Sequence, residues 1–276
     1  MKFSDQSLPV GQRIAARVEY AGAHFHGWQA QPHLAVETAQ ETLESALASV
    51  AGVPVPTTCA GRTDTGVHGF GQIVHFDDPV GRSAKAWVLG CNRHLSDAIR
   101  VHWVAPVNEQ FHARYSALSR QYRYVILNTP VRSAALAGSV TWYRHPLDLA
   151  AMNGAATTLL GEQDFSAFRA AACQASSAHR CVHHCSVVRE GDFVIIDIEA
   201  NAFLYHMVRN IAGSLLNVGS GRQSVSWFES VLASGDRTQA AETAPPDGLY
   251  LVRVNYPPEF ELPSVPDGPT IVTRAL

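Results

Sequence analysis

Residues 60–76 read AGRTDTGVHGFGQIVHF and combine a carboxylate, an arginine and four glycines in one short segment. The flanking residues 58–60 and 72–76 favour extended backbone, while the glycines between them supply the conformational freedom that a tight, exposed loop requires. The pattern therefore predicts two strands joined by a loop that presents Asp64 to something outside the chain.

An aspartate in a glycine-rich turn is commonly a turn former whose side chain bonds its own backbone, and this is the simplest interpretation of Asp64 taken alone. The complete run, however, resembles the catalytic motif of the TruA family of pseudouridine synthases. In that family, the pattern R-T-D-x-G-V-H carries the nucleophilic aspartate.

Five further segments, far apart in the chain, resemble elements of the same family. They are FHGWQ (25–29), FHARYS (111–116), YRY (122–124), NAFLYHMVRN (201–210) and APPDGLYL (244–251). Together with a strand predicted over Arg13 to Tyr20, the resemblance spans about residues 13–256.

Periodicity, capping residues and turn signals predict strands and helices in alternation. Helices are expected at 38–50, 83–95, 148–160, 203–218 and 224–233, and strands at 13–20, 99–104, 121–128, 186–190, 193–199 and 249–255. Short hairpin connections favour a mainly antiparallel sheet with helices on one face. We therefore predict an α/β chain of the α+β type, with two similar halves forming a central, mainly antiparallel sheet. The resemblance implies the same architecture, the pseudouridine synthase fold.

The expected organisation is an N-terminal half over 11–115 that carries the catalytic loop, a C-terminal half over 116–256, and a flexible tail over 257–276. The tail is predicted to be poorly ordered because it is rich in proline and polar residues and lacks periodicity.

The composition is that of a water-soluble protein: it contains no apolar run approaching the ~18 residues that span a bilayer, and the first ten residues lack an export signal. We expect a cytoplasmic protein without a membrane partner. The five cysteines are odd in number and scattered, which favours reduced thiols. A zinc site built from Cys173, Cys181, His183, His184 and Cys185 is a weaker alternative, because the spacing lacks a second CxxC-type pair.

A formal net charge of −3 is unusual for a protein that binds nucleic acid. A local patch can differ from the total, and Arg114, Arg120 and Arg123 lie beside Tyr115, Tyr122 and Tyr124 in the sequence. Arginine pairs with phosphate and tyrosine stacks on unpaired bases. The competing interpretation is a solvated strand edge whose aromatic residues face the core.

The resemblance implies a role for each of five residues and no cofactor or metal. Asp64 is expected to be the nucleophile, adding either to C6 of the uracil or to C1′ of the ribose. Arg209 would be its cationic partner, Arg62 would assist extrusion of the uridine from its stack, Tyr122 would stack on the base, and Leu249 would complete an apolar wall. The expected substrate is a uridine at positions 38 to 40 of the tRNA anticodon stem-loop, and the expected assembly is a homodimer.

Two other functions fit parts of the sequence. Asp64, His68, His75 and Asp77 contain suitable donors for a metal-dependent hydrolase, although their spacing does not itself show convergent geometry. A non-catalytic RNA-binding module would explain the arginine and tyrosine residues but would leave Asp64 without a purpose.

Overall fold

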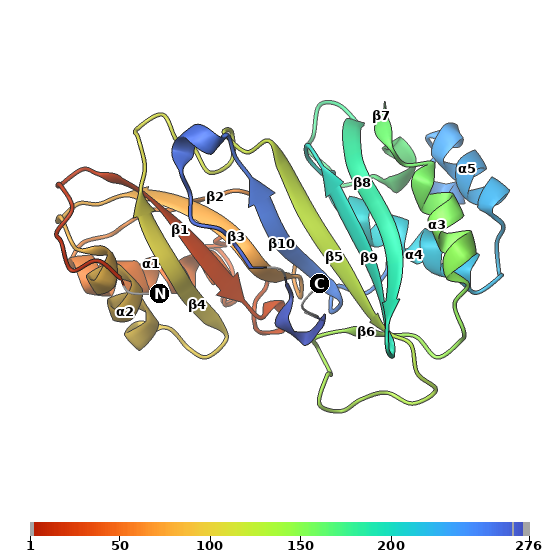
Figure 1. The fold of residues 1–276 in the computed structure, drawn as a ribbon, viewed down its shortest axis with the longest axis horizontal. Helices are drawn as coiled ribbons and strands as arrows, with labels where there is room; N and C mark the ends of the chain where they lie inside the picture. Colours follow the sequence, from red (N-terminus) through yellow and green to blue (C-terminus); the bar gives the residue numbers. More distant parts are fainter. Residues whose placement is uncertain (1–2, 267, 273–276) are drawn as a thin grey trace. The chain divides into compact units, whose positions relative to one another are not determined.

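The computed structural model describes residues 3–266 and 268–272, which contain five α-helices and a mainly antiparallel sheet of ten strands (Figure 1). The predicted fold class is therefore confirmed. The chain divides into two compact units, one of residues 1–118 and 251–268 and the other of residues 119–250 and 269–276. Residues 251–256 were expected in the second half of the chain. They group with the first unit because Gly71 packs directly against the backbone of Val252.

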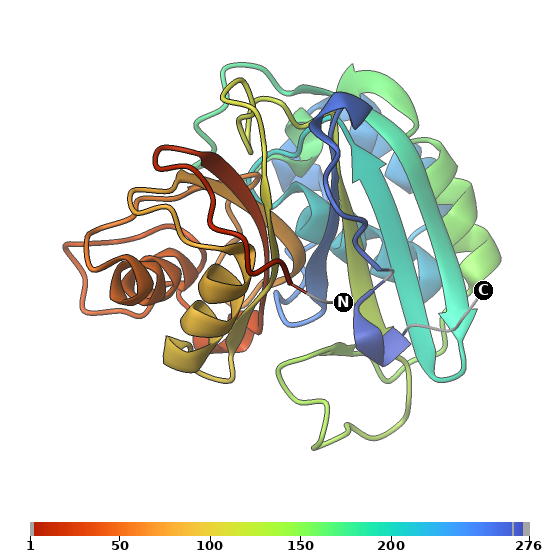
Figure 2. The ribbon, with the colours of Figure 1, turned by 60° about the vertical axis from the view of Figure 1, so that its left-hand side comes forward.

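The first unit contains strands that pack against two helices. The strands are β1 (Arg13–Tyr20), β2 (Thr58–Cys59), β3 (His68–Asp77) and β4 (Ile99–Pro106), and the helices are α1 (Ala39–Ala51) and α2 (Ala84–His94). Strand β1 pairs antiparallel with both β3 and β4, and β2 pairs with β3. Residues 14, 16, 18 and 20 of β1 join a buried apolar core with α1 and α2, as strand periodicity requires. Both helices lie on the same face of these strands (Figure 2).

The ends of the two helices confirm the capping signals in the sequence. Thr38, the first residue of the helix expected at 38–50, is the N-cap of α1: its hydroxyl accepts a hydrogen bond from the Glu41 amide and donates one to the Glu41 carboxylate. Ser83 accepts a hydrogen bond from the Ala86 amide at the start of α2. These local bonds satisfy backbone donors that the first helical turn leaves without intrahelical partners.

The opposite face of the first unit is partly covered by the segment after β10 (Leu249–Asn255). Phe260 is buried there, with its ring centroid 5.1 Å from that of Phe111. The flexible tail expected over 257–276 stays a prediction for residues 267 and 273–276, which lie outside the described part of the chain.

The second unit contains four antiparallel strands in the order β5 (Ser119–Leu127), β9 (Phe193–Ala200), β8 (His179–Glu190) and β7 (Gly161–Asp164). A short strand, β6 (Thr141–Trp142), pairs parallel to β5. Helices α3 (Leu149–Thr157), α4 (Met207–Gly219) and α5 (Val225–Ser234) lie on one face of these strands (Figure 2). Gly191 adopts φ +59° in the turn of the β8–β9 hairpin, which joins the strands expected at 186–190 and 193–199.

Helix α4 begins at Met207 rather than at Phe203, because His206 has φ +60° and a residue in that conformation cannot continue a right-handed helix. The longest described helices, α1 and α4, have 13 residues each. None of the helices in the described part of the chain is long and apolar enough to cross a membrane.

Candidate active site

The loop that carries Asp64 is held at its entrance by strand β3. The Ala60 amide donates to the Ile73 carbonyl at 2.8 Å, which extends the β2–β3 pairing to the edge of the loop. The Gln72 side chain then donates to the Gly61 carbonyl at 2.6 Å and accepts from the Gly61 amide at 3.4 Å. Gln72 has no exposed surface. A buried amide with both functions satisfied fixes the loop firmly, because breaking either bond would leave a polar group unpaired.

The middle of the loop is held by the segment that follows β1. The Thr63 carbonyl accepts from the Trp28 amide at 3.0 Å, and the Thr63 hydroxyl lies 2.7 Å from the Tyr20 hydroxyl. Gly27 adopts φ +85°, and a Cβ atom there would lie 2.8 Å from the Thr63 carbonyl oxygen. Only glycine fits this position without movement of the loop. The FHGWQ segment therefore acts as a support for residues 61–67.

Asp64 lies between these supports and a turn that closes the loop. Its carbonyl accepts from the Val67 amide at 3.0 Å, and Gly66 makes the turn with φ +82°. Thr63 is buried, Asp64 is half-buried, and Arg62 is exposed. The carboxylate is thus carried on a segment whose backbone is fixed on both sides, two residues from an exposed guanidinium.

Both histidines of β3 accept hydrogen bonds from backbone amides. His68 Nδ1 accepts from the Gly22 amide at 3.0 Å, and His75 Nδ1 accepts from the Ala113 amide at 3.1 Å. Asp77 pairs with Arg13, whose Nε lies 2.8 Å from its carboxylate. In the residues that the structure describes, no three His, Cys, Asp or Glu side chains are grouped so that they could hold a metal ion.

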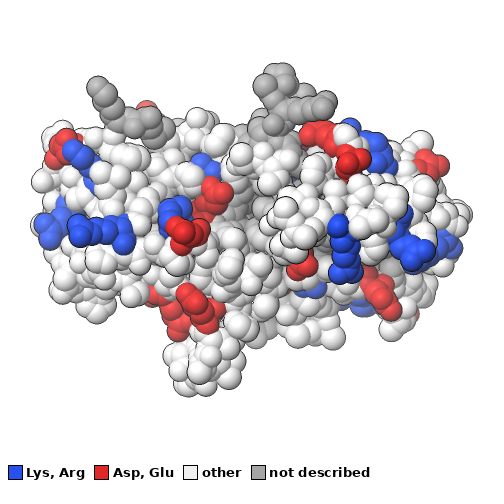
Figure 3. Space-filling view, turned by 90° about the horizontal axis from the view of Figure 1, so that it is seen from below, with Lys and Arg blue, Asp and Glu red and all other residues white. Residues whose placement is uncertain are grey.

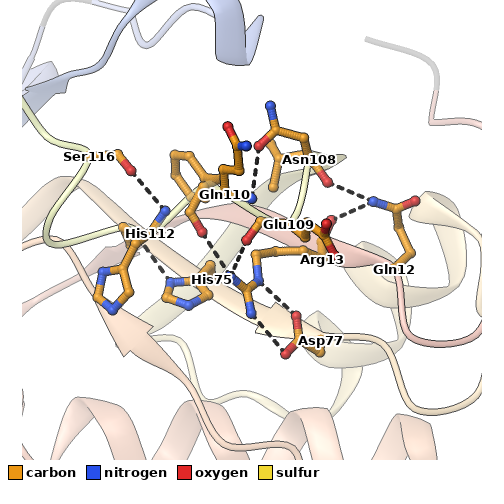
Figure 4. Close-up of polar contacts among 12 residues, drawn as sticks. Gln12, Arg13, His75, Asp77, Asn108, Glu109, Gln110, His112 and Ser116 are labelled. Carbon is orange, nitrogen blue, oxygen red and sulfur yellow. Dashed lines mark hydrogen bonds and ion pairs between the residues drawn. The ribbon is translucent and has the colours of Figure 1, made fainter.

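A polar network links β3 to the segment after β4 (Figure 4). Besides Asp77, the Arg13 guanidinium contacts the backbone carbonyls of Glu109 and Phe111, at 2.6 and 3.2 Å. Burial lowers the pKa of His75 to about 4, and the charges of His112 and Arg13 add to that effect while Asp77 opposes it. His75 is therefore neutral in the folded chain near pH 7, as its role as a hydrogen-bond acceptor requires.

Neutral His75 predicts a loss of folding stability in mild acid. Its pKa falls from 6.5 in the unfolded chain to about 4 in the folded one, so between these values the unfolded chain binds the extra proton. The contribution of neutral His75 to folding stability is complete above pH 6.5 and is lost as the pH falls toward 4. Over this range the free energy of unfolding falls by at most about 1.4 kcal/mol per pH unit.

Urea unfolding at pH 7.5 and at pH 5 measures this loss. His75→Gln retains an acceptor for the Ala113 amide but cannot titrate, so its free energy of unfolding should fall less on acidification than that of the wild type. Equal losses in the two proteins would show that His75 is not the titrating group.

Tyr122 and Leu249 lie in the second unit, each on a strand. Tyr122 is on β5, opposite Ile198 of β9, and only 8% of its surface is exposed. Its ring meets that of Phe203 edge to face, with 5.1 Å between centroids. Leu249 is buried as the first residue of β10.

Arg209 lies in the first turn of α4, as predicted. Its Nε donates to the Ala244 carbonyl at 2.8 Å, and the Ala244 amide donates to the Arg209 carbonyl at 3.1 Å. The next residue, Asn210, is completely buried and accepts from Arg237 and Thr243. The helix start and the segment 237–244 thus fix one another, and Arg209 is held at the helix end that favours a nearby anion.

The sequence was compared with known proteins. The family model described as tRNA pseudouridine synthase matches residues 16–116 and 155–257. A tRNA pseudouridine synthase A from Hydrogenovibrio crunogenus is 54% identical over 252 residues, covering 91% of this chain and 95% of that protein. One from Escherichia fergusonii is 50% identical over 267 residues, covering 97% and 98% of the two chains. This chain belongs to the tRNA pseudouridine synthase family.

Among solved structures, one chain of a Cbf5-Nop10-Gar1 complex aligns with a TM-score of 0.36 at 13% identity, covering 92% of this chain and 55% of that one. This likeness is too low to support a conclusion. Membership of the tRNA pseudouridine synthase family rests on the sequence matches. The ranges that the family model matches contain every quoted segment except YRY (122–124).

The expected site residues of this family member fall into two groups. Arg62 and Asp64 share one loop of the first unit, while Tyr122, Arg209 and Leu249 belong to the second unit. Sequence reasoning missed the supporting residues Gln72 and Tyr20. Gln72 did carry a signal, because it is a polar residue next to the apolar residues Ile73 and Val74 in a predicted strand, and a buried polar residue needs a partner.

The candidate zinc ligands lie along β8 and the loop before it. Cys181 Sγ is 3.8 Å from His183 Nδ1, while His184 Nε2 is 3.0 Å from the Ser186 hydroxyl. Cys185 is buried, and burial raises the pKa of its thiol to about 12. All five cysteines are free thiols.

Proposed function

We propose that this chain isomerises uridine to pseudouridine in tRNA, with Asp64 as the nucleophile. Its identity of 50–54% to tRNA pseudouridine synthases over nearly the whole chain carries this proposal. The local structure supports the choice of Asp64, since the chain fixes the backbone on both sides of one half-buried carboxylate. A reacting group held in this way needs little reorganisation when it reacts.

The reaction breaks the bond between N1 and C1′, turns the base and joins C5 to C1′. The C5 proton is lost and N1 gains one, so uridine and product have the same composition and no redox partner or phosphate donor takes part. An ionised Asp64 would add to C6 of the uracil or capture C1′ of the ribose. Either bond is temporary and is broken again when the carboxylate leaves.

The other four residues would prepare the uridine. Arg209 would offset the cost of keeping a carboxylate charged in a dry site, and the exposed Arg62 would take the place of the extruded base. Tyr122 would stack on the uracil and exchange a proton with it through its hydroxyl, and Leu249 would shield the base from water.

The proposed target is the anticodon stem-loop, at positions 38 to 40, in the cytoplasm. Basic and acidic side chains are interspersed on the face seen in Figure 3, and the formal net charge is −3. We therefore propose a homodimer, in which two copies together supply the positive surface that tRNA requires. Sedimentation velocity of the purified protein tests this assembly: a species of one chain mass at micromolar concentration would refute it.

Position-specific mapping tests the substrate. The wild-type protein is incubated with a tRNA transcript that has uridines at 38, 39 and 40, and with a matched transcript that has cytidine there. Pseudouridine is expected only in the first transcript and only at those positions. Modification elsewhere would reject the assigned positions, whereas tRNA binding without any pseudouridine would favour a non-catalytic binding module.

A further inference from the structure

The arginine and tyrosine residues that suggested an RNA-binding surface differ in their burial and in their partners. Tyr124 is completely buried, and its hydroxyl contacts Thr141 and the Pro245 carbonyl. Arg123 pairs with Asp197 at 2.7 Å. Arg114 and Tyr115, by contrast, are both exposed, and 76% of the Tyr115 surface is accessible. Most of the Tyr115 surface is therefore accessible to a binding partner.

The loop that carries Arg114 and Tyr115 is built on two imidazoles that accept hydrogen bonds from its backbone amides. His75 accepts from the Ala113 amide, and His112 Nδ1 accepts from the amides of both Arg114 and Tyr115 at 3.2 Å. The Ser116 hydroxyl accepts from the His112 amide at 3.0 Å, and the Ser116 amide donates to the His112 carbonyl at 2.9 Å (Figure 4). Successive amides are thus bound to side chains, which holds a short exposed turn in one conformation.

The rings form a stack from the sheet outward. The His75 and His112 centroids are 4.8 Å apart, and those of His112 and Tyr115 are 4.3 Å apart with 31° between the planes. The Arg114 guanidinium lies 5.5 Å from the Tyr115 ring centroid. We call the pair Arg114 and Tyr115 the 114–115 platform. It brings together an aromatic ring and a planar cation that lies over it, and these are the groups that bind an unpaired base and its phosphate.

The 114–115 platform lies near the Asp64 loop within the same unit. His75, at the base of the stack, is opposite Thr58 in the β2–β3 ladder, and β2 leads directly into the loop. Burial raises the pKa of the Cys59 thiol to about 12, and the charges of both Arg62 and Arg114 act against that rise. Both guanidinium groups therefore lie within electrostatic range of one side chain. The 114–115 platform and the Asp64 loop are thus on neighbouring parts of the same unit.

We propose that the 114–115 platform binds a nucleotide of the tRNA other than the target uridine, with its base stacked on Tyr115 and its phosphate paired with Arg114. This inference deepens the proposed function and rests on it. The target uridine must be extruded to reach Asp64, and an independent hold on a neighbouring nucleotide keeps the backbone in register while that occurs.

The test compares tRNA binding and turnover of the wild type with those of Tyr115→Ala, Tyr115→Phe and Arg114→Gln. Tyr115→Ala is expected to raise the Kd for tRNA about 10-fold, the size of one lost base stack, while Tyr115→Phe keeps the wild-type Kd. Arg114→Gln should reduce the slope of log Kd against log salt by about 0.7 to 0.9, the loss of one phosphate contact. Rates at saturating tRNA should change less than the Kd, because the platform does not contact the reacting base.

Leu89→Ala is the matched control. Leu89 is a 51% exposed apolar residue on α2 in the same unit, and its removal should leave the Kd unchanged. Thermal unfolding of all variants checks their folding, and the exposed position of Tyr115 predicts little loss of stability. The proposed function and the platform are tested by different outcomes. Absence of pseudouridine from the wild-type reaction would refute the proposed function, whereas equal Kd values for the wild type and Tyr115→Ala would refute the platform.

Discussion

Substitution of Asp64 by asparagine is expected to reduce pseudouridine formation about 10⁴-fold or more, which is the scale of effect when an enzyme loses its nucleophile. Asparagine has nearly the shape of aspartate but no charge, so it cannot form the bond to C6 or C1′. The loop should keep its structure, because its supports use the backbone of residues 61, 63 and 64 and the side chain of Thr63. Release of tritium from C5-labelled uridine in tRNA measures the rate.

The matched control is Asp97→Asn, because Asp97 is a fully exposed carboxylate of the same unit that pairs with Arg100. This control is expected to have the wild-type rate. Binding of tRNA to Asp64→Asn should stay within a few-fold of wild type, which separates lost chemistry from lost affinity. If Asp64→Asn retained more than a tenth of the wild-type rate, Asp64 would not be the nucleophile.

Replacement of Arg209 by glutamine is expected to lower the rate at saturating tRNA about 10²–10³-fold, the usual consequence of removing one fixed charge from a reaction centre. Arg209→Lys separates two roles of this residue. Lysine keeps the charge but has no Nε group to donate to the Ala244 carbonyl. If the charge is what matters, lysine retains clearly more activity than glutamine.

Equal loss in Arg209→Lys and Arg209→Gln, accompanied by lower thermal stability, would instead assign Arg209 to holding the segment around Ala244. Arg222→Gln serves as the control, since Arg222 is an exposed arginine just after α4. It is expected to have the wild-type rate.

Those parts of the fold that depend on local sequence signals were predicted closely. Strands β1 and β10 begin and end at the predicted residues, and the caps Thr38, Ser83, Asp148 and Ser224 lie where they were expected. These signals are local, because a capping side chain binds an amide only two or three residues away. Elements whose existence depends on distant partners were missed. The strand β7 has mostly exposed residues without alternation, and it exists because β8 pairs with it.

The candidate site shows the same division. The sequence placed Asp64 on a loop between strands, because glycines and extended flanks are local features. It could not show that Gln72 and Tyr20 hold that loop, since these bonds join residues 11 and 43 positions apart. The start of α4 was predicted too early because the positive φ of His206 is not a property that histidine usually signals. The roles of Tyr122, Arg209 and Leu249 came from family resemblance alone, and they stay predictions.

The most direct test of the central claim is pseudouridine mapping on one tRNA transcript after incubation with the wild type or with Asp64→Asn, in the absence of nucleotide. We predict pseudouridine in the anticodon stem-loop with the wild type and none with the variant, while both proteins bind the RNA. Pseudouridine formed at equal rates by the two proteins would contradict the role of Asp64. RNA bound by both proteins but modified by neither would contradict the proposed activity itself.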